Sequence, residues 1–456
     1  MNNIKIGPIE INFLWLALII AIGMKSWLVI SDEVPFNGDE AVVALMARHM
    51  TQGEIPLSFY GQTHMGSLDA MLIALGFLVF GQHVWVIRLV QSLLYVGTIV
   101  TTTHIGKKVF GQREVGNLAG LLLAIPTVNV TLYTTATLGG YGETLLIGNL
   151  ILLSGLRIAD EMGARKSAPF WHWFLCGGLS GLGFWVLSFT LVYTIPMGLY
   201  LLVKLIEIWN RQERLQIIKA VGGGLLGALL GSAPWWISAW QNHWQQLFVV
   251  TVSNQYPLLL APFVHLFGFL LLGTTVIFGL RPPWGVTWLM LPLIPFALMI
   301  WLGIFVHMIR RVRLDQANRK KIAVLIGVMV VLVLGFVFTP FGNDPSGRYF
   351  VPLAIPLSLF AADMIISLKD EQKILAWGLV VFLLIFNLGG TVQSALQYPP
   401  GITTQFGEST RIDHRYDEAL IEFLSSKGID RGYSNYWVSY PLAFLSREEL
   451  IFVPSI

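Results

Sequence analysis

Long apolar stretches alternate with short polar segments along the whole chain. A helix needs about 20 apolar residues to cross a bilayer. Stretches of roughly that length lie near residues 11–30, 83–105, 115–133, 143–158, 170–187, 189–206, 217–236, 286–309, 322–339, 349–367 and 374–393. We therefore predict an all-α polytopic membrane protein with about eleven transmembrane helices.

Basic residues gather in alternate loops, and this placement predicts the orientation of the chain. Lys and Arg cluster at 107–113, 157–166, 204–219, 310–321 and 369–373, and such loops are cytoplasmic by the positive-inside rule. The apolar stretches 68–81 and 258–280 would break the alternation if they crossed the membrane, so we predict that both lie at the outer interface. The amino terminus is then cytoplasmic, and the carboxyl end is extracytoplasmic.

The predicted layout divides the chain into two domains. Residues 1–393 form the transmembrane domain, with a first outer loop at 31–82 and a second large outer loop at 237–285. Residues 394–456 form an extracytoplasmic segment in which helical and strand-like patterns alternate, so we predict a small α/β unit there. An incomplete domain is one interpretation of this short segment.

The composition supports the membrane assignment and excludes several other classes of protein. Of 456 residues, 55% are hydrophobic and 12% are charged, with a mean hydropathy of +0.68, which excludes an ordinary water-soluble enzyme. A net charge of +3 is too small to predict nucleic-acid binding. The single cysteine, Cys176, excludes an internal disulfide. No nucleotide-binding loop is present, so the sequence requires no cofactor, although paired carboxylates leave a divalent metal open.

The first outer loop is strongly acidic and holds the first candidate site residues. It has one basic residue, Arg48, against six acids: Asp32, Glu33, Asp39, Glu40, Glu54 and Asp69. Apolar side chains at helical spacing in 41–50 predict an amphipathic helix on the membrane surface. In the first turn of that helix, the Asp39 carboxylate either accepts a proton from a hydroxyl or simply caps the helix. The local pattern leaves both interpretations open.

Three short motifs follow one another in residues 36–94, namely Asp39-Glu40, Phe80-Gly81 and Arg88-Leu89. With the interfacial helices between them, they resemble the first outer loop of the C-type (GT-C) membrane glycosyltransferases. The similarity is to the branch of the protein O-mannosyltransferases and the lipid A aminoarabinose transferase. The predicted topology, with eleven spans and a cytoplasmic amino terminus, is also similar to theirs.

The resemblance implies an enzyme that moves a hexosyl or pentosyl group from a polyprenyl-phosphate-linked donor to an acceptor on the outer face, with inversion. It implies that Asp39 is the catalytic general base. It also implies that Arg348, in "NDPSGRYFVPLAIP", holds the leaving phosphate, a task that suits a guanidinium. The other interpretation of Arg348 is an interfacial side chain whose head group reaches water.

Four further residues are predicted to bind substrate. Glu40 adjoins the general base, and Glu143 is the only acid between residues 115 and 159, at a membrane boundary where an ionisable group is costly. A helix cap is the alternative for Glu143. Tyr60 and His64 lie in "YGQTHMGS", where related families often carry His or Asn before two prolines. This departure leaves the donor and acceptor contacts open, and His64 also fits an ordinary loop histidine.

Three other cations lie near predicted outer helix ends: Lys25, Arg88 and Arg281. Long cationic side chains at such places usually extend toward the membrane surface. We therefore predict that these three residues snorkel, with the alternative that any of them adds positive charge at the phosphate.

Two other function classes fit a polytopic chain. A lipid or small-molecule transporter or flippase would place ionisable residues near mid-span on broken helices, and a scaffold in a cell-envelope assembly would need no catalytic group. The enzyme interpretation predicts as partners a polyprenyl-phosphate sugar donor, a lipid, glycan or protein acceptor, and membrane lipid, without nucleic acid. It also predicts the plasma membrane of a prokaryotic cell as the location.

Overall fold

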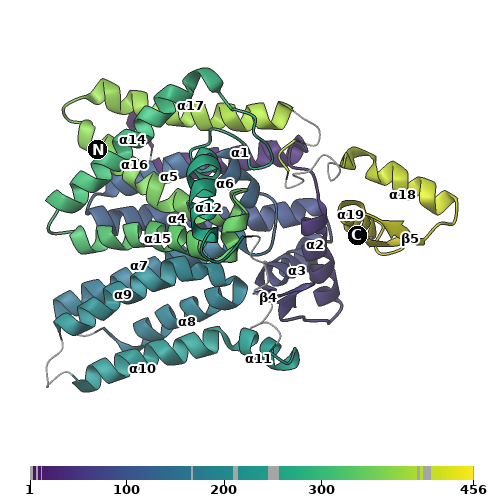
Figure 1. Ribbon diagram of the computed structural model, residues 1–456, viewed down its shortest axis with the longest axis horizontal. Coiled ribbons are helices and arrows are strands. Elements are labelled where there is room, and N and C mark those ends of the chain that lie inside the picture. The colour runs from purple at the N-terminus through teal and green to yellow at the C-terminus, as the bar shows by residue number, and fades with distance from the viewer. Residues whose placement is uncertain are drawn as a thin grey trace.

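The computed structural model describes residues 4–6, 9–11, 13–165, 168–208, 214–244, 256–397, 401–403 and 412–454. Most of these residues belong to long helices that lie side by side in one bundle (Figure 1). The bundle carries a smaller carboxyl-terminal unit at one end. The fold class predicted from the apolar pattern, an all-α polytopic bundle with a small α/β segment, is confirmed.

Helices occupy the positions predicted for the eleven spans. Their bounds are α1 Phe13–Ile30, α4 Val84–Phe110, α5 Arg113–Ala124 with α6 Val128–Tyr133, α7 Tyr141–Arg165, α8 Phe170–Val186, α9 Leu191–Glu207, α10 Arg214–Gly231 with α11 Ala233–Gln241, α14 Ile294–Leu314, α15 Arg319–Phe338, η7 Arg348–Leu353 with α16 Ala354–Leu368, and α17 Lys373–Gln397.

In the described part of the chain, eight helices are long and apolar enough to cross a membrane, or nine if the bent pair α10–α11 is one span. Two predicted spans fall short. The first, 115–133, is interrupted between α5 and α6 around Pro126, because proline lacks a backbone donor and disfavours helix at the residue before it. The second, α8, has only 17 residues. The multi-pass character is confirmed, and the count of eleven spans is not.

Glycines let α8 and α10 pack against each other with their backbones in contact. A Cβ atom added to Gly227 would lie 2.0 Å from the carbonyl oxygen of Phe174, and one added to Gly231 would lie 2.2 Å from that of Gly178. Small residues at such crossings are typical of helices in lipid, where close packing replaces the hydrophobic driving force. This contact holds the lower part of the bundle in Figure 1 together.

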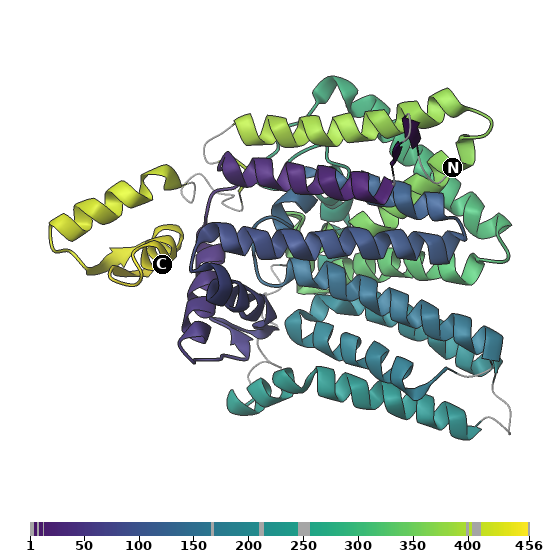
Figure 2. The same ribbon diagram turned by 180° about the vertical axis from the view of Figure 1, so that it is seen from behind.

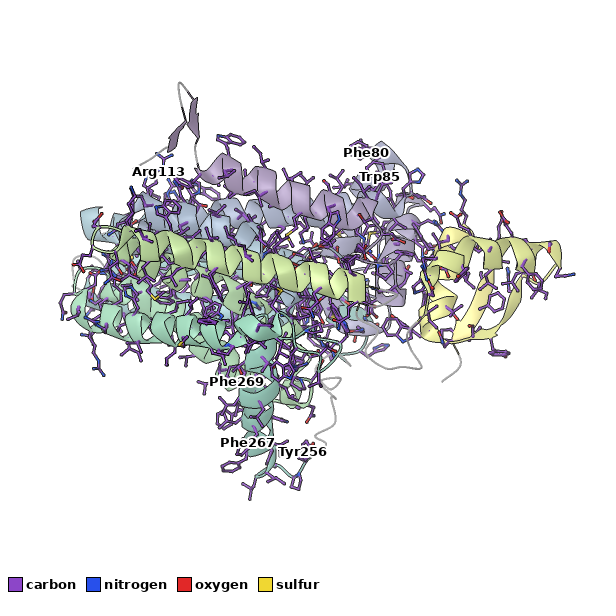
Figure 3. All side chains as sticks on the ribbon, turned by 90° about the horizontal axis from the view of Figure 1, so that it is seen from above. Phe80, Trp85, Arg113, Tyr256, Phe267 and Phe269 are labelled. Carbon is purple, nitrogen blue, oxygen red and sulfur yellow. The ribbon has the colours of Figure 1, made fainter. Side chains whose placement is uncertain are left out.

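Two short apolar helices match the stretches predicted to lie at the interface. Helix α3 spans Leu68–Phe80 and follows α2, Gly38–Thr51, and the hairpin of β3, Ser58–Phe59, and β4, Gln62–Gly66. The second comprises α12 Ala261–Gly268, the π-helical turn η4 Phe269–Gly273 and α13 Thr274–Ile277. Figure 3 shows it projecting from the bundle, with Phe267 near its free end. Both are shorter than the span-length helices, and their place at the outer interface stays a prediction.

The carboxyl-terminal segment is a compact α/β unit. It contains η9 His414–Tyr416, α18 Asp417–Ser426, β5 Arg431–Ser434, α19 Tyr436–Leu445 and β6 Ile451–Pro454, with β5 and β6 paired in parallel. Helix α19 packs against α2 at the end of the bundle, as Figure 2 shows from behind. The domain boundaries at residues 393 and 394 stay a prediction.

The remaining elements are short. They are β1 Ile4–Ile6 paired with β2 Ile9–Ile11, and the turns η1 Ser188–Thr190, η5 Leu291–Leu293 and η6 Pro340–Asn343.

Candidate active site

Helix α2 places Asp39 at the end of the bundle that carries the carboxyl-terminal segment. Asn37 is the N-cap of α2, because its side-chain oxygen accepts a hydrogen bond from the backbone N–H of Glu40 at 3.2 Å. Asp39 therefore sits inside the first turn, and the interpretation of Asp39 as the helix cap is wrong. Its side chain is free to take part in tertiary contacts.

The Asp39 carboxylate faces groups from the far carboxyl-terminal part of the chain. The hydroxyl of Tyr436 donates a hydrogen bond to Asp39 Oδ1 at 2.9 Å. Burial raises the pKa of Asp39, while the Tyr436 hydrogen bond and the positive charge of Arg348 act in the opposite direction. Arg348 is thus close enough to favour the ionised form of Asp39, and the two predicted residues share one electrostatic environment.

Arg348 is the first residue of η7 and follows the loop that connects α15 to η7. It forms an ion pair with Asp344, four residues earlier, and its guanidinium lies 5.3 Å from the centre of the Tyr349 ring. Tyr133 and Tyr141 also lie within the electrostatic reach of Arg348. The guanidinium is partly exposed, at 42% for the side chain. It is therefore neither buried in the core nor extended alone toward the membrane surface.

Gly347 sets the direction of Arg348. Its φ of +111° lies in the left-handed region, and its carbonyl oxygen accepts a hydrogen bond from Asn129 Nδ2 at 3.0 Å. A Cβ atom at this position would lie 2.5 Å from Asn129 Oδ1 and 2.7 Å from Val276. The loop therefore requires glycine here.

Replacing Gly347 by Ala is expected to lower transfer activity about tenfold, because a left-handed alanine costs about 1–2 kcal/mol and the new methyl group displaces Arg348. Steady-state rates of the purified variant measure the effect. Gly335→Ala is the matched control, since the space around the Gly335 Cβ position is open within 4 Å. Equal activity of Gly347→Ala and wild type would show that the loop conformation does not matter.

Glu40 is fully buried and paired with Arg88. Arg88 Nη2 donates to Glu40 Oε2 at 2.7 Å, and the backbone N–H of Thr137 donates to Glu40 Oε1 at 3.4 Å. Burial raises the pKa of Glu40 to about 7, although the charge of Arg88 opposes this rise. These contacts favour a positioning role, in which Glu40 ties α2 to α4. Substrate binding by Glu40 stays a prediction.

The three cations predicted to snorkel are buried instead. Lys25, Arg88 and Arg281 expose 5%, 4% and 5% of their surface. Lys25 Nζ donates to the carbonyl oxygen of Thr131 and to the hydroxyls of Thr134 and Thr135. Arg281 donates to the carbonyl oxygens of Leu272 and Gly285 and to the Thr275 hydroxyl. The prediction is wrong because each cation donates hydrogen bonds to protein oxygen atoms inside the bundle instead of reaching water.

Glu143 forms a buried carboxyl pair with Asp69 of α3. Asp69 accepts hydrogen bonds from Gln91 Nε2 at 2.9 Å and from the Thr137 hydroxyl. Burial raises the pKa of Asp69, and the hydrogen bonds, one of them to Glu143, lower it. Both Glu143 oxygens are buried without a protein donor in the described part of the chain, and two carboxyl groups this close repel each other unless one of them carries a proton. Thr137 connects Asp69 to Glu40, the neighbour of Asp39 in the chain, so the carboxyl pair belongs to the same polar network as Glu40.

Tyr60 and His64 lie on the β3–β4 hairpin. The Tyr60 hydroxyl is 3.0 Å from His49 Nδ1, and His49 follows Asp39 by about 15 Å along the axis of α2. Burial lowers the pKa of His64, so its neutral form is favoured, and its Nδ1 atom is buried without a hydrogen-bond partner in the structure. Tyr60 therefore contacts the other end of α2 from Asp39, and the role of both residues in substrate binding stays a prediction.

The structure adds residues that the sequence did not single out. Asp344 pairs with Arg348 at a spacing of four residues, which is a readable signal in "NDPSGRYF". Asp69, the partner of Glu143, is held by Thr137 and Gln91, and Tyr436 contacts Asp39. Their separation in the chain gives no local signal. In the described ranges, no group of three or more His, Cys, Asp or Glu residues is arranged to hold a metal ion.

Two comparisons with known proteins found matches, one to a family and one to solved structures. The family described as dolichyl-phosphate-mannose-protein mannosyltransferase matches residues 68–238. These residues include α3, the Asp69–Glu143 pair and the spans up to α11. A sequence comparison with curated proteins gave no match.

Solved structures match nearly the whole chain. ArnT from Cupriavidus metallidurans bound to undecaprenyl phosphate has a TM-score of 0.58 at 15% identity, with 96% of this chain and 85% of that chain covered. The Archaeoglobus fulgidus oligosaccharyltransferase in complex with Zn and sulfate has a TM-score of 0.60 at 11% identity, with 97% and 62% covered. AglB from the same organism, in complex with an inhibitory peptide and a dolichol-phosphate, has a TM-score of 0.55 at 12% identity, with 97% and 64% covered.

At these identities the structural matches show the fold, and the family match adds a sequence pattern over 68–238. Both agree with the resemblance predicted from the first outer loop. The chain therefore has the fold of the GT-C membrane glycosyltransferase superfamily and resembles its protein O-mannosyltransferase and ArnT branch.

Proposed function

We propose that the protein moves a sugar from a polyprenyl-phosphate-linked donor to an acceptor hydroxyl on the extracytoplasmic face of the membrane, with inversion at the anomeric carbon. The observation that carries this proposal is the shared environment of Asp39 and Arg348, which come from opposite halves of the chain. A carboxylate and a guanidinium placed together supply a base for the acceptor and a cation for the leaving phosphate.

In the proposed reaction, Asp39 accepts the proton of the acceptor hydroxyl as its oxygen attacks the anomeric carbon. The bond between that carbon and the phosphate oxygen breaks on the opposite face of the sugar. The polyprenyl phosphate leaves with the bonding electrons, and Arg348 stabilises the negative charge that develops on it. Asp344 and Tyr349 hold the guanidinium in place before the donor arrives.

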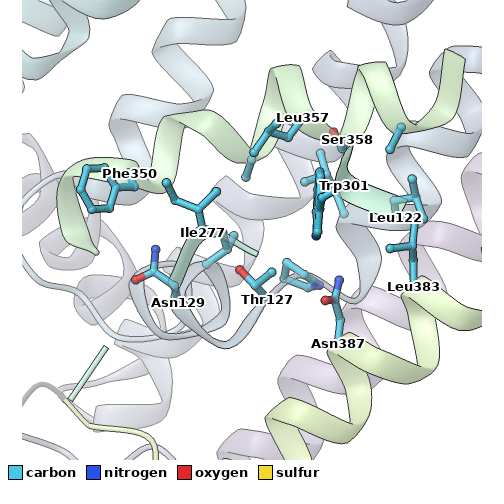
Figure 4. Close-up of a pocket in the computed structure, with 15 residues that line it drawn as sticks. Leu122, Thr127, Asn129, Ile277, Trp301, Phe350, Leu357, Ser358, Leu383 and Asn387 are labelled. Carbon is cyan, nitrogen blue, oxygen red and sulfur yellow. The ribbon is translucent and has the colours of Figure 1, made fainter. Parts of the chain in front are cut away.

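A groove beside Arg348 supports a lipid-linked donor. It is narrow, with a cavity volume of about 60 Å³, and it lies between the α5–α6 break, α13, α14, α16 and α17 (Figure 4). Asn129 and Phe350 line the groove and are adjacent to the Gly347–Arg348 loop. Most of the other lining residues are apolar, such as Leu122, Leu357 and Leu383. An isoprenoid tail bound here would have to widen the groove, with its phosphate end toward Arg348.

Replacing Ala354 by Phe is expected to raise KM about tenfold for a long polyprenyl-phosphate donor, because the ring fills space in the groove. For a donor with a short isoprenoid tail, KM should rise much less. Donor titrations with both tail lengths measure the difference. Ala323→Phe is the matched control, since Ala323 is exposed on α15. A loss that is equal for both tail lengths would remove the groove from the donor site.

The printed ligands of two structural relatives agree with this proposal. ArnT is bound to undecaprenyl phosphate and AglB to a dolichol-phosphate. We propose that this chain also binds a polyprenyl phosphate. The sugar and the acceptor, whether lipid, glycan or protein, are to be identified by assay.

The deciding experiment incubates the purified protein in lipid with a panel of polyprenyl-phosphate sugars and follows the release of free polyprenyl phosphate. We expect release with at least one donor, and an anomeric configuration in the product opposite to that of the donor. Donor movement across the membrane without cleavage would instead favour the transporter interpretation. No release and no movement with any donor would leave the scaffold interpretation.

A further inference from the structure

We infer that Tyr436 of the carboxyl-terminal segment is a positioning residue for Asp39, so that the segment completes the active site rather than standing beside it. This inference rests on the proposed role of Asp39 as general base. It adds a residue from the last part of the chain to a site built from α2 and η7.

The segment is docked firmly against the helix that carries Asp39. Phe444 of α19 packs against Phe36 and Phe77 with ring centres 5.4 Å and 6.0 Å apart. Arg48 Nη2 donates to the Phe444 carbonyl oxygen at 2.8 Å, and its guanidinium lies 4.4 Å from the centre of the Phe444 ring. Buried aromatic packing of this kind fixes the orientation of two elements.

Glu448 adds a second set of contacts at the same junction. It pairs with Arg48 at 3.4 Å and with His49 at 2.9 Å. Arg48 is 3% exposed, so the contact replaces hydration that the guanidinium has lost. These contacts lie at the carboxyl end of α2, while Tyr436 meets its amino end, so α19 is held at two separated points.

The contact at the amino end depends on a close approach at Gly38. A Cβ atom added there would lie 2.9 Å from the Tyr436 ring and 3.1 Å from its carbonyl oxygen. Asn435 caps α19 by accepting from the backbone N–H of Val438 at 3.0 Å, and Tyr440 packs against the Tyr436 ring with centres 4.9 Å apart. The ring of Tyr436 is therefore fixed from both sides, and its hydroxyl points at Asp39 Oδ1.

Few other charged or titratable groups reach Asp39 from the elements around α2. The positive charge of Arg348 in η7 lowers the pKa of Asp39. The charges of Arg348 and Asp39 both reach Tyr133 of α6. Asp69 of α3 and Arg88 of α4 act on Glu40 instead. Tyr436 occupies one acceptor position on Oδ1, so the carboxylate keeps other lone pairs for the proton of the acceptor.

The Tyr436 hydrogen bond stabilises the ionised carboxylate, so its loss raises the pKa of Asp39. A general base works in its ionised form, and activity falls as the pH drops through that pKa. Replacing Tyr436 by Phe is therefore expected to move the acid limb of the kcat/KM profile by about one pH unit toward higher pH. The plateau at higher pH should fall less than the rate at low pH.

Tyr440→Phe is the matched control, because it removes a hydroxyl from the same helix and keeps the ring that supports Tyr436. Its acid limb should coincide with that of wild type. Glu448→Gln weakens the docking of α19 far from Asp39, and it should shift the acid limb in the same direction as Tyr436→Phe by a smaller amount. A uniform loss of rate with an unchanged profile in Tyr436→Phe would overturn the inference.

An infrared titration separates failure of this inference from failure of the proposed function. The difference spectrum between wild type and Asp39→Asn isolates the Asp39 carboxyl band without any turnover. We expect that band to titrate at higher pH in Tyr436→Phe, even if no donor is cleaved. An unchanged titration would show that Tyr436 does not hold Asp39.

Discussion

Replacing Asp39 by Asn is expected to lower transfer by about 10²- to 10⁴-fold, the usual contribution of a general base. The amide has nearly the same size as the carboxylate and can still accept the Tyr436 hydrogen bond, so the fold and donor binding should persist. Only the ability to take the acceptor proton is lost. Release of polyprenyl phosphate and donor binding, measured on the same preparation, check both parts of this expectation.

The matched control is Glu33→Gln, which neutralises an acid of the same outer loop that is partly exposed. It should leave the rate within about twofold of wild type. Substantial turnover by Asp39→Asn would mean that another acid is the base, with Glu143 and Asp32 the next to test. In wild type the acid limb should lie above the usual pH range of an aspartate, because burial raises the pKa of Asp39.

The sequence predicted the positions of the helices well, because apolar stretches of membrane length leave little choice of structure. It predicted their number less well. The stretch 115–133 reads as one span, but Pro126 divides it into α5 and α6. Asn129 lies in α6 just after the break and holds the Arg348 loop through Gly347. Residues at the break also form part of the wall of the groove. The helix break at Pro126 therefore contributes to the candidate site, and the apolar pattern could not predict it.

The sequence identified both charges of the candidate site but few of their partners. Asp39 and Arg348 were identified through the resemblance to the GT-C enzymes, since the local pattern also allowed a helix cap and an interfacial side chain. Tyr436 does not stand out, since a tyrosine in an aromatic segment has many ordinary roles. Lys25 was assigned to the surface because a lysine near a helix end usually reaches water. Its three threonine oxygen partners lie more than 100 residues away in the chain.

Buried charged and polar side chains next to Asp39 fix the position of α2 in the bundle. Arg88 and Glu40 join α4 to α2, and Thr137 joins Glu40 to the Asp69–Glu143 pair. Removing one member of such a network leaves the others buried without compensation. Variants of Glu40 or Glu143 are therefore expected to lose stability as well as activity, whereas variants of Asp39 and Arg348 should lose activity while remaining folded.

Replacing Arg348 by Ala is expected to reduce kcat/KM by about 10²-fold, since a charge-assisted hydrogen bond to phosphate contributes about 1.5–3 kcal/mol. Donor affinity should fall, and the departure of the phosphate should slow. Arg348→Lys should recover only part of the loss, because a lysine keeps the charge but not the forked geometry. Binding of free polyprenyl phosphate, measured beside turnover, separates the two effects.

Two further variants test whether the lower activity of Arg348→Ala comes from lost phosphate binding rather than from misfolding. Arg431→Ala removes an exposed arginine of the carboxyl-terminal segment, whose guanidinium contacts the carbonyl oxygens of Asp430 and Glu449, and it should behave as wild type. Asp344→Asn removes the negative partner of Arg348, so the guanidinium should bind free polyprenyl phosphate as tightly as wild type or more tightly. If Arg348→Ala changed neither phosphate binding nor kcat, the leaving group would be held by another cation, and the charge of Arg348 would serve only to lower the pKa of Asp39.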